Sequence, residues 1–570
     1  MSAAIQVPKS TEPSRLDEMV SRLQAGSKTW AVLPISEKIA VAERLLAGWM
    51  KVVDRLVAAG VEAKGITPGS PQEGEEWLAG AYPTVRILRL TIEALKQIRD
   101  TGNTTLGKVG RTIDGRLTVQ LYPMNLMDKA LFGGLVAEVH LEKGVDQAEL
   151  DRSRAAFYKK PDHSGKVSLV LGAGNVNSIP PTDVLTKMFN EGKICILKMN
   201  PINAYVGPLI EEAWGELIAK NWLAVVYGGA EEGAYLCNHA GVDEIHITGS
   251  DKTHDAIVWG PAGPDRAARM AKNDPLLKKE ISSELGNVSP VLIVPGPWDD
   301  KSLGFQAENI AGMMTNNASF NCNAAKMIVT PKGWAKRDWL FDRVMSTVAK
   351  VPARKAWYPG AKDRYASLMK DRAGVRTAGT GDGTLPWTLI PGLNADDASD
   401  RAFSTEPFCS IISATEVGGD DPIDFLDRAV NFANDKLWGT LVATILVHPK
   451  TLKDPKAAEA LERAIVKLRY GAVGINLWPA FAFALGNTPW GAYPGATLTN
   501  IQSGRGWVHN TSMLEHVEKV VIRHPVTGFP KPPYFPLHKT ARELGRAVTL
   551  LEETGSWTRF PPVLLAGLRG

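Results

Sequence analysis

The spacing of apolar residues changes along the first 145 residues. From Leu16 to about Asp100 they recur every three or four positions, as in LDEMVSRLQA and AVAERLLAGWMKVVDRLVAAG. This period predicts amphipathic helices that bury one face. Next, RLTVQLYPM and LVAEVHLEK cluster β-branched and apolar residues on either side of an FGG break. They predict two extended segments joined by a turn, a protruding hairpin.

From Lys166 onward, short apolar runs alternate with helix-length segments. The runs are VSLVLGAG, ICILKMN, WLAVVYGG and DEIHITGS, and a second cycle follows with SPVLIVPG, AKMIVTP, LVATILVHP and GAVGINLW. Strands that are apolar throughout predict parallel sheets with helical crossovers. The stretch 353–404, rich in Gly, Pro, Asp and Arg, predicts a surface excursion between strands. The tail beyond Arg505 carries no chemistry that the sequence assigns.

Composition narrows the class of protein. The chain has 570 residues, 44% of them hydrophobic and 22% charged, so we expect two or three lobes of ordinary globular type. A net charge of +4 is too weak to indicate nucleic acid. The N-terminus lacks the apolar run of a secretion signal, and no run of about 18 apolar residues predicts a membrane span.

The four cysteines are scattered without CxxC spacing: Cys195, Cys237, Cys322 and Cys409. This pattern argues against a disulfide framework and against a zinc site, so we expect no metal and a reducing, cytoplasmic setting. Cys322 differs from the others because it lies in a polar loop, NNASFNCNAAK. Glu284, in ELGNVSP, supplies a carboxylate. A thiol with a nearby carboxylate base suggests covalent chemistry on an aldehyde or acyl group.

Eight motifs occur in order over about residues 150–510: GAGNVNSIPP, ILKMNP, HITGSD, ELGNVSP, FNCNAAK, STEPF, GAVGIN and PWGAYPG. In this order and approximate spacing the chain resembles the aldehyde dehydrogenase superfamily. The resemblance implies an α/β fold with a Rossmann-type cofactor domain, an α/β catalytic domain and a small oligomerisation hairpin. The implied domains are the helical N-terminal part of the cofactor domain (1–117), the hairpin (118–145), the dinucleotide-binding domain (146–285), the catalytic domain (286–485), and a return to the cofactor domain with an oligomerisation strand and a C-terminal extension (486–570).

The resemblance also implies catalytic roles. Cys322 resembles the nucleophile and Glu284 the general base, while Cys195, Cys237 and Cys409 are expected to be packing residues. Asn175 lies 23 residues before Lys198, where the family places its oxyanion asparagine, although Asn177 competes for this role. Side-chain amides of this kind commonly contribute about 3 kcal/mol to stabilising charge on a substrate oxygen.

The cofactor residues implied by the resemblance line a dinucleotide. Lys198 would bind the adenosine ribose, Gly249 and Ser250 the pyrophosphate, and Glu406 the nicotinamide ribose. Phe408 and Gly174 complete the implied set. Plain alternatives remain for Lys198 and for the TGS turn: a lysine at a strand end and an ordinary turn. Pro201 stands where many NAD-preferring members carry a glutamate, which permits NADP, so the cofactor is NAD or NADP.

The implied reaction is oxidation of a small-molecule aldehyde to a carboxylic acid through a covalent Cys322 thiohemiacetal and thioester. Trp478, Phe481 and Phe483 would make the substrate mouth apolar and favour a hydrophobic aldehyde. One alternative is an acylating aldehyde dehydrogenase or acyl-CoA reductase, although such relatives generally lack the base. Another is a non-catalytic nucleotide-binding member. The resemblance further implies a homodimer or homotetramer built through the hairpin and a strand near residues 515–523.

Overall fold

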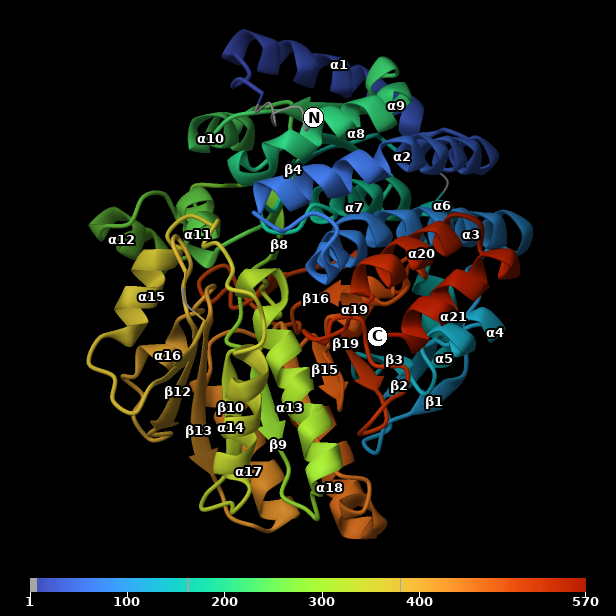
Figure 1. Cartoon of the computed structure of the whole chain (residues 1–570). Helices are drawn as coiled ribbons and strands as arrows, with labels where there is room; N and C mark the ends of the chain where they lie inside the picture. The colour runs from blue at the N-terminus through green and yellow to red at the C-terminus, as the bar shows by residue number, and fades with distance from the viewer. Residues whose placement is uncertain (1–7, 161–162, 380) are drawn as a thin grey trace.

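Two large sheets organise the chain, one above the other in Figure 1. The computed structural model describes residues 8–160, 163–379 and 381–570, so the first seven residues of the predicted N-terminal part lie outside it. Within the described residues, a six-stranded sheet and an eleven-stranded sheet are accompanied by a small ribbon of β16 (Pro489–Gly491) and β18 (Trp507–His509).

The six-stranded sheet has the order β17-β8-β7-β4-β5-β6. Its strands are β4 (Val167–Leu171), β5 (Ile194–Lys198), β6 (Leu223–Val226), β7 (Glu244–Thr248), β8 (Glu280–Glu284) and β17 (Gly504–Arg505). All neighbours pair in parallel except β17, which is antiparallel to β8. The apolar runs that the sequence places here therefore form the predicted parallel sheet.

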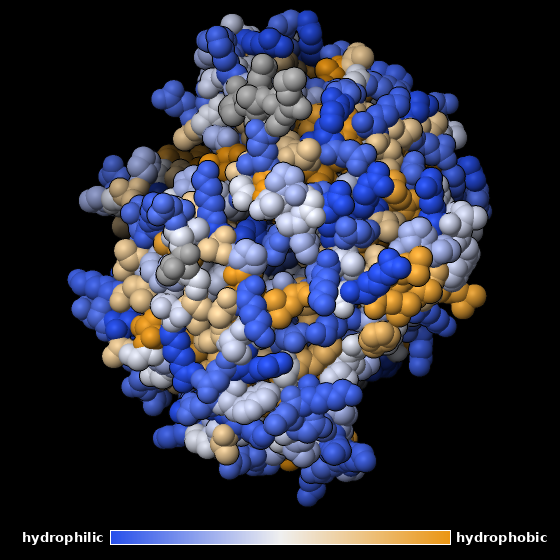
Figure 2. Space-filling view, viewed as in Figure 1, coloured by the Kyte–Doolittle hydropathy of each residue, from blue (hydrophilic) through white to orange (hydrophobic). Residues whose placement is uncertain are grey.

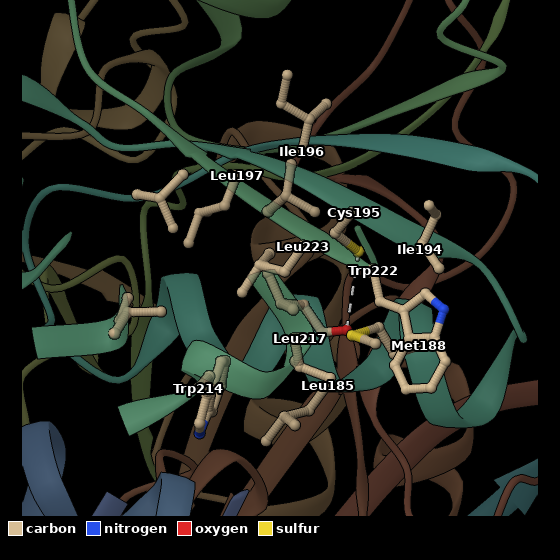
Figure 3. Close-up of a cluster of buried hydrophobic side chains, with 14 of the residues drawn as sticks. Leu185, Met188, Ile194, Cys195, Ile196, Leu197, Trp214, Leu217, Trp222 and Leu223 are labelled. Atoms are coloured by element: carbon tan, nitrogen blue, oxygen red, sulfur yellow. Dashed lines mark hydrogen bonds between the residues drawn. The ribbon is translucent and has the colours of Figure 1, made fainter. Parts of the chain in front are cut away.

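The N-terminal helices cover this sheet. They are α1 (Pro13–Ala31), α2 (Ile35–Ala63) and α3 (Tyr82–Thr101), as the three- and four-residue spacing predicts. Figure 3 shows Cys195 on β5 surrounded by apolar side chains of neighbouring elements, with its thiol directed to the Val184 carbonyl at 3.9 Å. Burial raises the pKa of Cys195 well above its ordinary value. Cys237 and Cys409 are also buried, so these three cysteines pack the core, as expected.

The eleven-stranded sheet has the order β1-β2-β3-β19-β15-β14-β9-β10-β13-β12-β11. Its strands are β1 (Val109–Arg111), β2 (Leu117–Tyr122), β3 (Val136–Leu141), β9 (Pro290–Ile293), β10 (Met327–Pro331), β11 (Arg376–Ala378), β12 (Trp387–Leu393), β13 (Ile411–Val417), β14 (Val442–Leu446), β15 (Ala472–Ile475) and β19 (Val517–Arg523). Its central strands pair in parallel. Packed around the sheet are α13 (Asp300–Thr315), α14 (Arg337–Val348), α17 (Pro422–Lys436) and α18 (Pro455–Lys467).

Stretch 353–404 is more ordered than its composition suggests. It contains α15 (Ala361–Met369), α16 (Arg401–Ser404), β11 and β12. Trp387, Leu389 and Ile390 of β12 are buried, and the strand pairs in parallel with β13. The apolar WTLI run was therefore a strand signal within a polar stretch.

The predicted hairpin does not stand apart from the sheet. β2 and β3 pair antiparallel, and α4 (Leu126–Leu131) lies in the connection between them. β19 pairs antiparallel with β3 and in parallel with β15, so it joins the hairpin to the large sheet of the same chain. The proposed domain boundaries and oligomeric assembly stay predictions.

The C-terminal segment folds back over the N-terminal helices. α20 (Ala541–Thr554) packs against α3, and α21 (Phe560–Leu568) packs against α20. At this interface Glu552 accepts hydrogen bonds from Arg86 at 2.5 Å and from Arg89 at 2.9 Å, and all three side chains are largely buried. Figure 2 shows apolar side chains gathered over the C-terminal helices on the right of the view. No helix in the described ranges is long and apolar enough to cross a membrane.

Replacing Glu552 tests whether this buried ion pair fastens the C-terminal segment. Glu552→Ala leaves the Arg86 guanidinium buried without its closest carboxylate. We expect the free energy of unfolding to fall by about 3–5 kcal/mol. Glu543→Ala, on the same helix, is the control: its pair with Arg542 is solvent-exposed and contributes about 1 kcal/mol or less. Urea unfolding followed by tryptophan fluorescence compares the variants, and equal losses would contradict a fastening role.

Candidate active site

Cys322 lies in a loop held in an uncommon backbone conformation. Between α13 and β10, Asn317, Ala318 and Ser319 have φ of 53°, 54° and 68°. Such left-handed angles are unfavourable for residues other than glycine, so surrounding contacts must hold them. Lys326 Nζ donates to the Ser319 carbonyl at 3.0 Å and to its hydroxyl at 2.8 Å. The cysteine is thereby presented on a fixed loop.

Glu284 stands at the C-terminal end of β8 and faces the cysteine. Cys322 Sγ donates a hydrogen bond to Glu284 Oε1 at 3.4 Å. Oε2 is buried and has no hydrogen-bond partner among the described residues. Burial raises the pKa of Glu284 to about 7, the nearby Asp183 carboxylate adds to the rise, and the Trp490 indole opposes it. A carboxyl group with this pKa can both accept and release a proton near neutral pH.

The thiol itself is protonated in this state. Burial raises the pKa of Cys322 well above its ordinary value, and the negative charges of Glu284 and Glu406 raise it further. The thiol therefore needs a base or a change of surroundings to react.

Asn175 and Asn177 have different positions. The Asn175 amide donates to the Phe320 carbonyl at 2.9 Å, beside the cysteine loop. Asn177 instead donates to Glu76 at 3.1 Å and accepts from Tyr205 at 3.1 Å. The side chain of Asn177 is thus occupied away from Cys322, and the geometry favours Asn175 for contact with a substrate oxygen.

A buried ion pair that sequence reasoning missed lies beneath this loop. Lys64, at the end of α2, donates to Glu76 Oε1 at 2.7 Å. The same ammonium group donates to the Asn175 carbonyl and to Asn317 Oδ1, each at 3.1 Å. Glu76 begins the π-helical turn η2 (Glu76–Ala81). No local pattern distinguishes these two charges in the sequence, because their role depends on contacts with residues more than 100 positions away.

Two cavities meet at the cysteine. The larger is a cleft of about 1140 Å³, and the smaller is an apolar pocket of about 130 Å³. Cys322, Glu284 and Asn175 line both of them. The six residues of the implied cofactor set all line the larger cleft: Gly174, Lys198, Gly249, Ser250, Glu406 and Phe408. Trp478, Phe481 and Phe483 line the smaller pocket.

The wall of the cleft nearest the six-stranded sheet presents a helix N-terminus. Ser250 caps α11 (Asp251–Trp259) by accepting from the Thr253 amide at 3.1 Å. The Gly249 amide is already used, because it donates to the Glu284 carbonyl at 3.0 Å. Lys198 ends β5, and burial lowers its pKa. At Gly174 a Cβ atom would lie 2.7 Å from the Asn200 side chain, so a larger residue there would displace the Asn200 amide group.

On the opposite wall, Glu406 is held at the edge of the large sheet. Its Oε1 accepts from the Asn287 amide at 3.2 Å, and its carboxylate lies so close to Gly286 that a side chain there would collide with it. Burial raises the pKa of Glu406 to about 7, and the ammonium group of Lys326 opposes this rise. Lys326 and Gly286 were not singled out in the sequence, although Gly286 is part of the ELGN motif.

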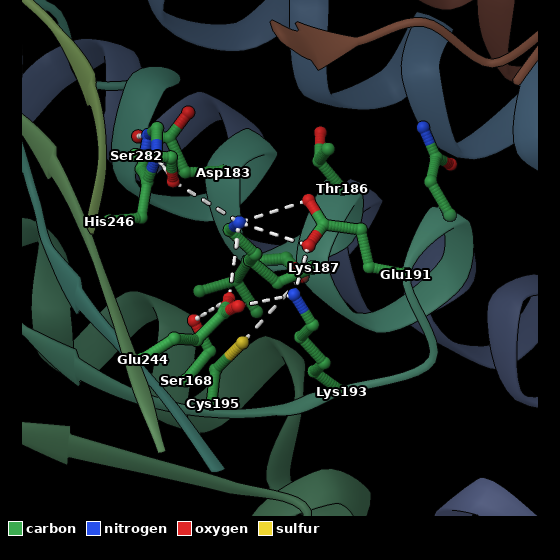
Figure 4. A network of polar contacts seen from close by, with 12 residues as sticks. Ser168, Asp183, Thr186, Lys187, Glu191, Lys193, Cys195, Glu244, His246 and Ser282 are labelled. Carbon is green, nitrogen blue, oxygen red and sulfur yellow. Dashed lines mark hydrogen bonds and ion pairs between the residues drawn. The ribbon is translucent and has the colours of Figure 1, made fainter. Parts of the chain in front are cut away.

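Polar side chains around Lys187 link β7 and β8, and Figure 4 shows this network. Lys187 Nζ donates to Glu191 at 2.9 Å and to Ser282 at 3.3 Å, and it also pairs with Glu244 at 3.2 Å. Ser282 in turn contacts His246 Nδ1 at 2.9 Å. The network ties β7 and β8 together two residues before Glu284, which restrains the position of that carboxylate.

Comparison with known proteins agrees with this architecture, although no family model matches the chain. The chain is 24% identical over 275 residues to an N-succinylglutamate 5-semialdehyde dehydrogenase of Ectopseudomonas mendocina, covering 47% of this chain and 45% of that protein. It is 22% identical over 257 residues to aminoaldehyde dehydrogenase ALDH10A8, chloroplastic, of Arabidopsis thaliana, covering 42% and 46%. The chain thus spans about half the length of these curated relatives.

A solved structure matches over most of both chains. The NADP-dependent glyceraldehyde-3-phosphate dehydrogenase from Bacillus halodurans C-125, complexed with NADP, superposes with a TM-score of 0.59 at 16% identity, covering 90% of this chain and 92% of that one. The chain therefore has the fold of the aldehyde dehydrogenases, and its sequence is similar to members of that superfamily. The fold class that the sequence predicts is confirmed, while the roles of the individual site residues are not tested by these similarities.

Alkylation of Cys322 tests its electrostatic coupling to Glu284. Because the Glu284 charge raises the pKa of the thiol, Glu284→Gln lowers this pKa. We expect alkylation by iodoacetamide at pH 8 to become about tenfold faster, which corresponds to one pKa unit. Cys322→Ala provides the background from the other cysteines. Slower alkylation in Glu284→Gln would mean that Glu284 instead assists deprotonation in the resting protein.

The buried Lys64–Glu76 pair has a separate test. Lys64→Met keeps the side-chain length but removes the hydrogen bonds to Asn175 and Asn317. Hydrogen bonds from a charged donor contribute about 1.5–3 kcal/mol, so amide exchange in residues 316–323 should accelerate by about 10- to 100-fold. Hydrogen exchange with mass spectrometry measures this. Lys51→Met, on the exposed face of α2, is the control, and equal exchange in both variants would exclude the support role.

Proposed function

We propose that this protein oxidises an aldehyde to a carboxylic acid with NAD or NADP, through covalent intermediates on Cys322. The single observation that carries the proposal is the position of Cys322, Glu284 and Asn175 at the junction of the large cleft and the small apolar pocket. The large cleft can hold a cofactor and the small pocket a substrate. Because Cys322 lines both cavities, the two bound molecules would meet at its sulfur atom. The superfamily supports this division.

The cleft suits a dinucleotide. It is large, and the N-terminus of α11 lies in its wall, where free amide groups and the helix dipole favour a pyrophosphate. Gly174 keeps the backbone free of a side chain at the base of the cleft. Lys198 and Glu406 would hold the two riboses. When bound, the nicotinamide supplies an acceptor for the hydride of the aldehyde carbon. Pro201 in the wall leaves no carboxylate there to repel a 2′-phosphate, which supports NADP as well as NAD.

The protein side chains provide the remaining chemistry. Glu284 Oε1 accepts the thiol hydrogen bond and is placed to take the proton as the sulfur attacks the carbonyl carbon. The Asn175 amide and the Cys322 backbone amide would donate to the substrate oxygen as it becomes negative. After hydride loss the acyl group remains on Cys322 as a thioester. Glu284 would then accept a proton from the attacking water, and the sulfur would leave as the acid forms.

A turnover assay tests the proposal. Purified protein with an aldehyde should reduce NAD or NADP without coenzyme A, and Cys322→Ala should abolish this. Because the base form of Glu284 is needed, kcat should rise with pH through about 7. In Glu284→Gln, kcat should no longer rise with pH through about 7 and should be at least about 100-fold lower than in the unmodified protein. The thioester on Cys322 should accumulate and be detected as an increase in protein mass.

The control outcomes separate the competing classes. Cofactor reduction that requires coenzyme A would favour an acylating enzyme, in which the acyl group passes to the thiol of coenzyme A. Binding of the cofactor without turnover of any aldehyde would favour a non-catalytic member. Glu280→Gln, an exposed carboxylate four residues earlier, should leave the pH profile unchanged.

We also infer a homodimer or homotetramer and a reducing, cytoplasmic location. The superfamily supports the assembly, and the four free cysteines support the location. Because β3 and β19 already pair within the chain, an assembly would have to use other surfaces or exchange these strands between subunits. Light scattering coupled to size exclusion measures the subunit number.

A further inference from the structure

No cationic side chain lines the small pocket at Cys322 in the part of the chain that the structure describes. Among the described residues that line it, the charged ones are Glu75 and Glu284. Glu75 is neutralised by Arg354, whose Nη1 donates to both carboxylate oxygens at 2.9 and 3.0 Å. Apolar and aromatic side chains make up most of the remaining wall. Burying an anionic substituent here would remove its hydration without a partner of opposite charge, which is strongly unfavourable. For a cationic substituent the carboxyl group left is Glu284, which already accepts the hydrogen bond of the Cys322 thiol.

Part of the wall comes from the C-terminal segment, for which the sequence assigns no role. Pro533 and Tyr534, after β19, and Val548, on α20, line the pocket together with the aromatic residues of 478–483. Tyr534 and Val548 are 9% and 3% exposed, respectively. The segment therefore forms part of the wall that the small pocket does not share with the large cleft.

Hydrogen bonds and ring contacts fix this wall relative to the cysteine. The Tyr534 hydroxyl donates to Asn309 Oδ1 at 2.7 Å and accepts from the Trp478 amide at 3.4 Å. The rings of Tyr534 and Trp478 lie 5.2 Å apart. The Trp478 indole donates to the carbonyl of Asn323, the neighbour of Cys322, at 2.8 Å. The position of Tyr534 is thereby linked to that of the sulfur through two side chains.

We propose that residues 525–570 form a specificity wall, in which Tyr534 and Val548 restrict the pocket to compact, uncharged, apolar aldehydes. This rests on the proposed aldehyde oxidation and names its substrate class. The pocket volume of about 130 Å³ is on the order of ten water-sized volumes, which suits a six-carbon chain or one aromatic ring. Longer chains would meet α20.

Three aldehydes of equal size and different charge test the class. Hexanal is neutral, succinic semialdehyde carries a carboxylate, and betaine aldehyde carries a quaternary ammonium; all three have the same number of non-hydrogen atoms. We expect kcat/KM for hexanal to exceed that for either charged aldehyde by at least about 100-fold. Similar values for the three would overturn the proposal.

Substitutions in the wall test its contribution. Val548→Phe should lower kcat/KM for hexanal and benzaldehyde by at least about tenfold while acetaldehyde, which occupies only the region near Cys322, changes little. Val548→Ala should raise kcat/KM for decanal relative to hexanal. Leu550→Phe adds the same aromatic group on the same helix outside the pocket lining and is the matched control. If the order of kcat/KM among the aldehydes is unchanged in both Val548 variants, the proposed specificity wall is contradicted.

A readout without turnover separates failure of this inference from failure of the proposed reaction. Alkylation of Cys322 by N-hexyl iodoacetamide, by iodoacetamide and by iodoacetate, with NADH or NADPH occupying the large cleft, reports access to the sulfur through the small pocket. We expect Val548→Phe to slow only the hexyl reagent, and iodoacetate to be the slowest reagent in the unmodified protein. If no aldehyde is oxidised but this pattern holds, the pocket inference survives and the oxidation does not. If iodoacetate reacts as fast as iodoacetamide, the uncharged pocket is excluded.

Discussion

The contact between the Cys322 thiol and the Glu284 carboxyl group depends on how two sheets meet. Glu284 ends β8 of the six-stranded sheet, whereas Cys322 follows α13 and precedes β10 of the eleven-stranded sheet. Segment 285–287 joins them: the Leu285 amide donates to the Ser503 carbonyl, and the Asn287 amide side chain donates to the Val442 carbonyl, both at 2.8 Å. A shift of about 1 Å at this junction would separate the two groups, and displacements of this size can cost 100-fold in rate.

Burial affects the two reactive groups in the same direction. It raises the pKa of the carboxyl group of Glu284 to about 7 and the pKa of the Cys322 thiol well above its ordinary value. At neutral pH the thiol form of Cys322 is therefore favoured, while the Glu284 carboxyl group exchanges its proton with the surroundings. The proton of Cys322 can leave once a polar substrate and solvent change the surroundings. This is because the main cause of the raised thiol pKa is missing hydration of the thiolate and not a fixed ion pair. A protected thiol and a base that works near neutral pH are two results of one buried environment.

Local sequence patterns were sufficient to predict the strands of the parallel sheets and the residues that follow them. The strands β4, β5 and β7 are buried along almost their whole length, and each ends at a residue that lines the large cleft. The parallel topology therefore places Asn175, Lys198 and Ser250 around one cavity. The Lys64–Glu76 pair could not be predicted in this way, because its partners are distant in sequence. The same holds for β19, whose pairing with both β3 and β15 within the chain depends on the whole sheet.

The two cavities have different origins in the sequence, which bears on what similarity can reveal. The large cleft is lined by residues between about 150 and 510, the region whose motifs resemble those of the aldehyde dehydrogenase superfamily. The substrate pocket also draws on Tyr82 of α3, Tyr534 and Val548, which lie outside that region. The similarity to these two relatives extends over about half of each of them, so it does not name the aldehyde of this chain. The substrate has to be inferred from the wall that this chain itself builds.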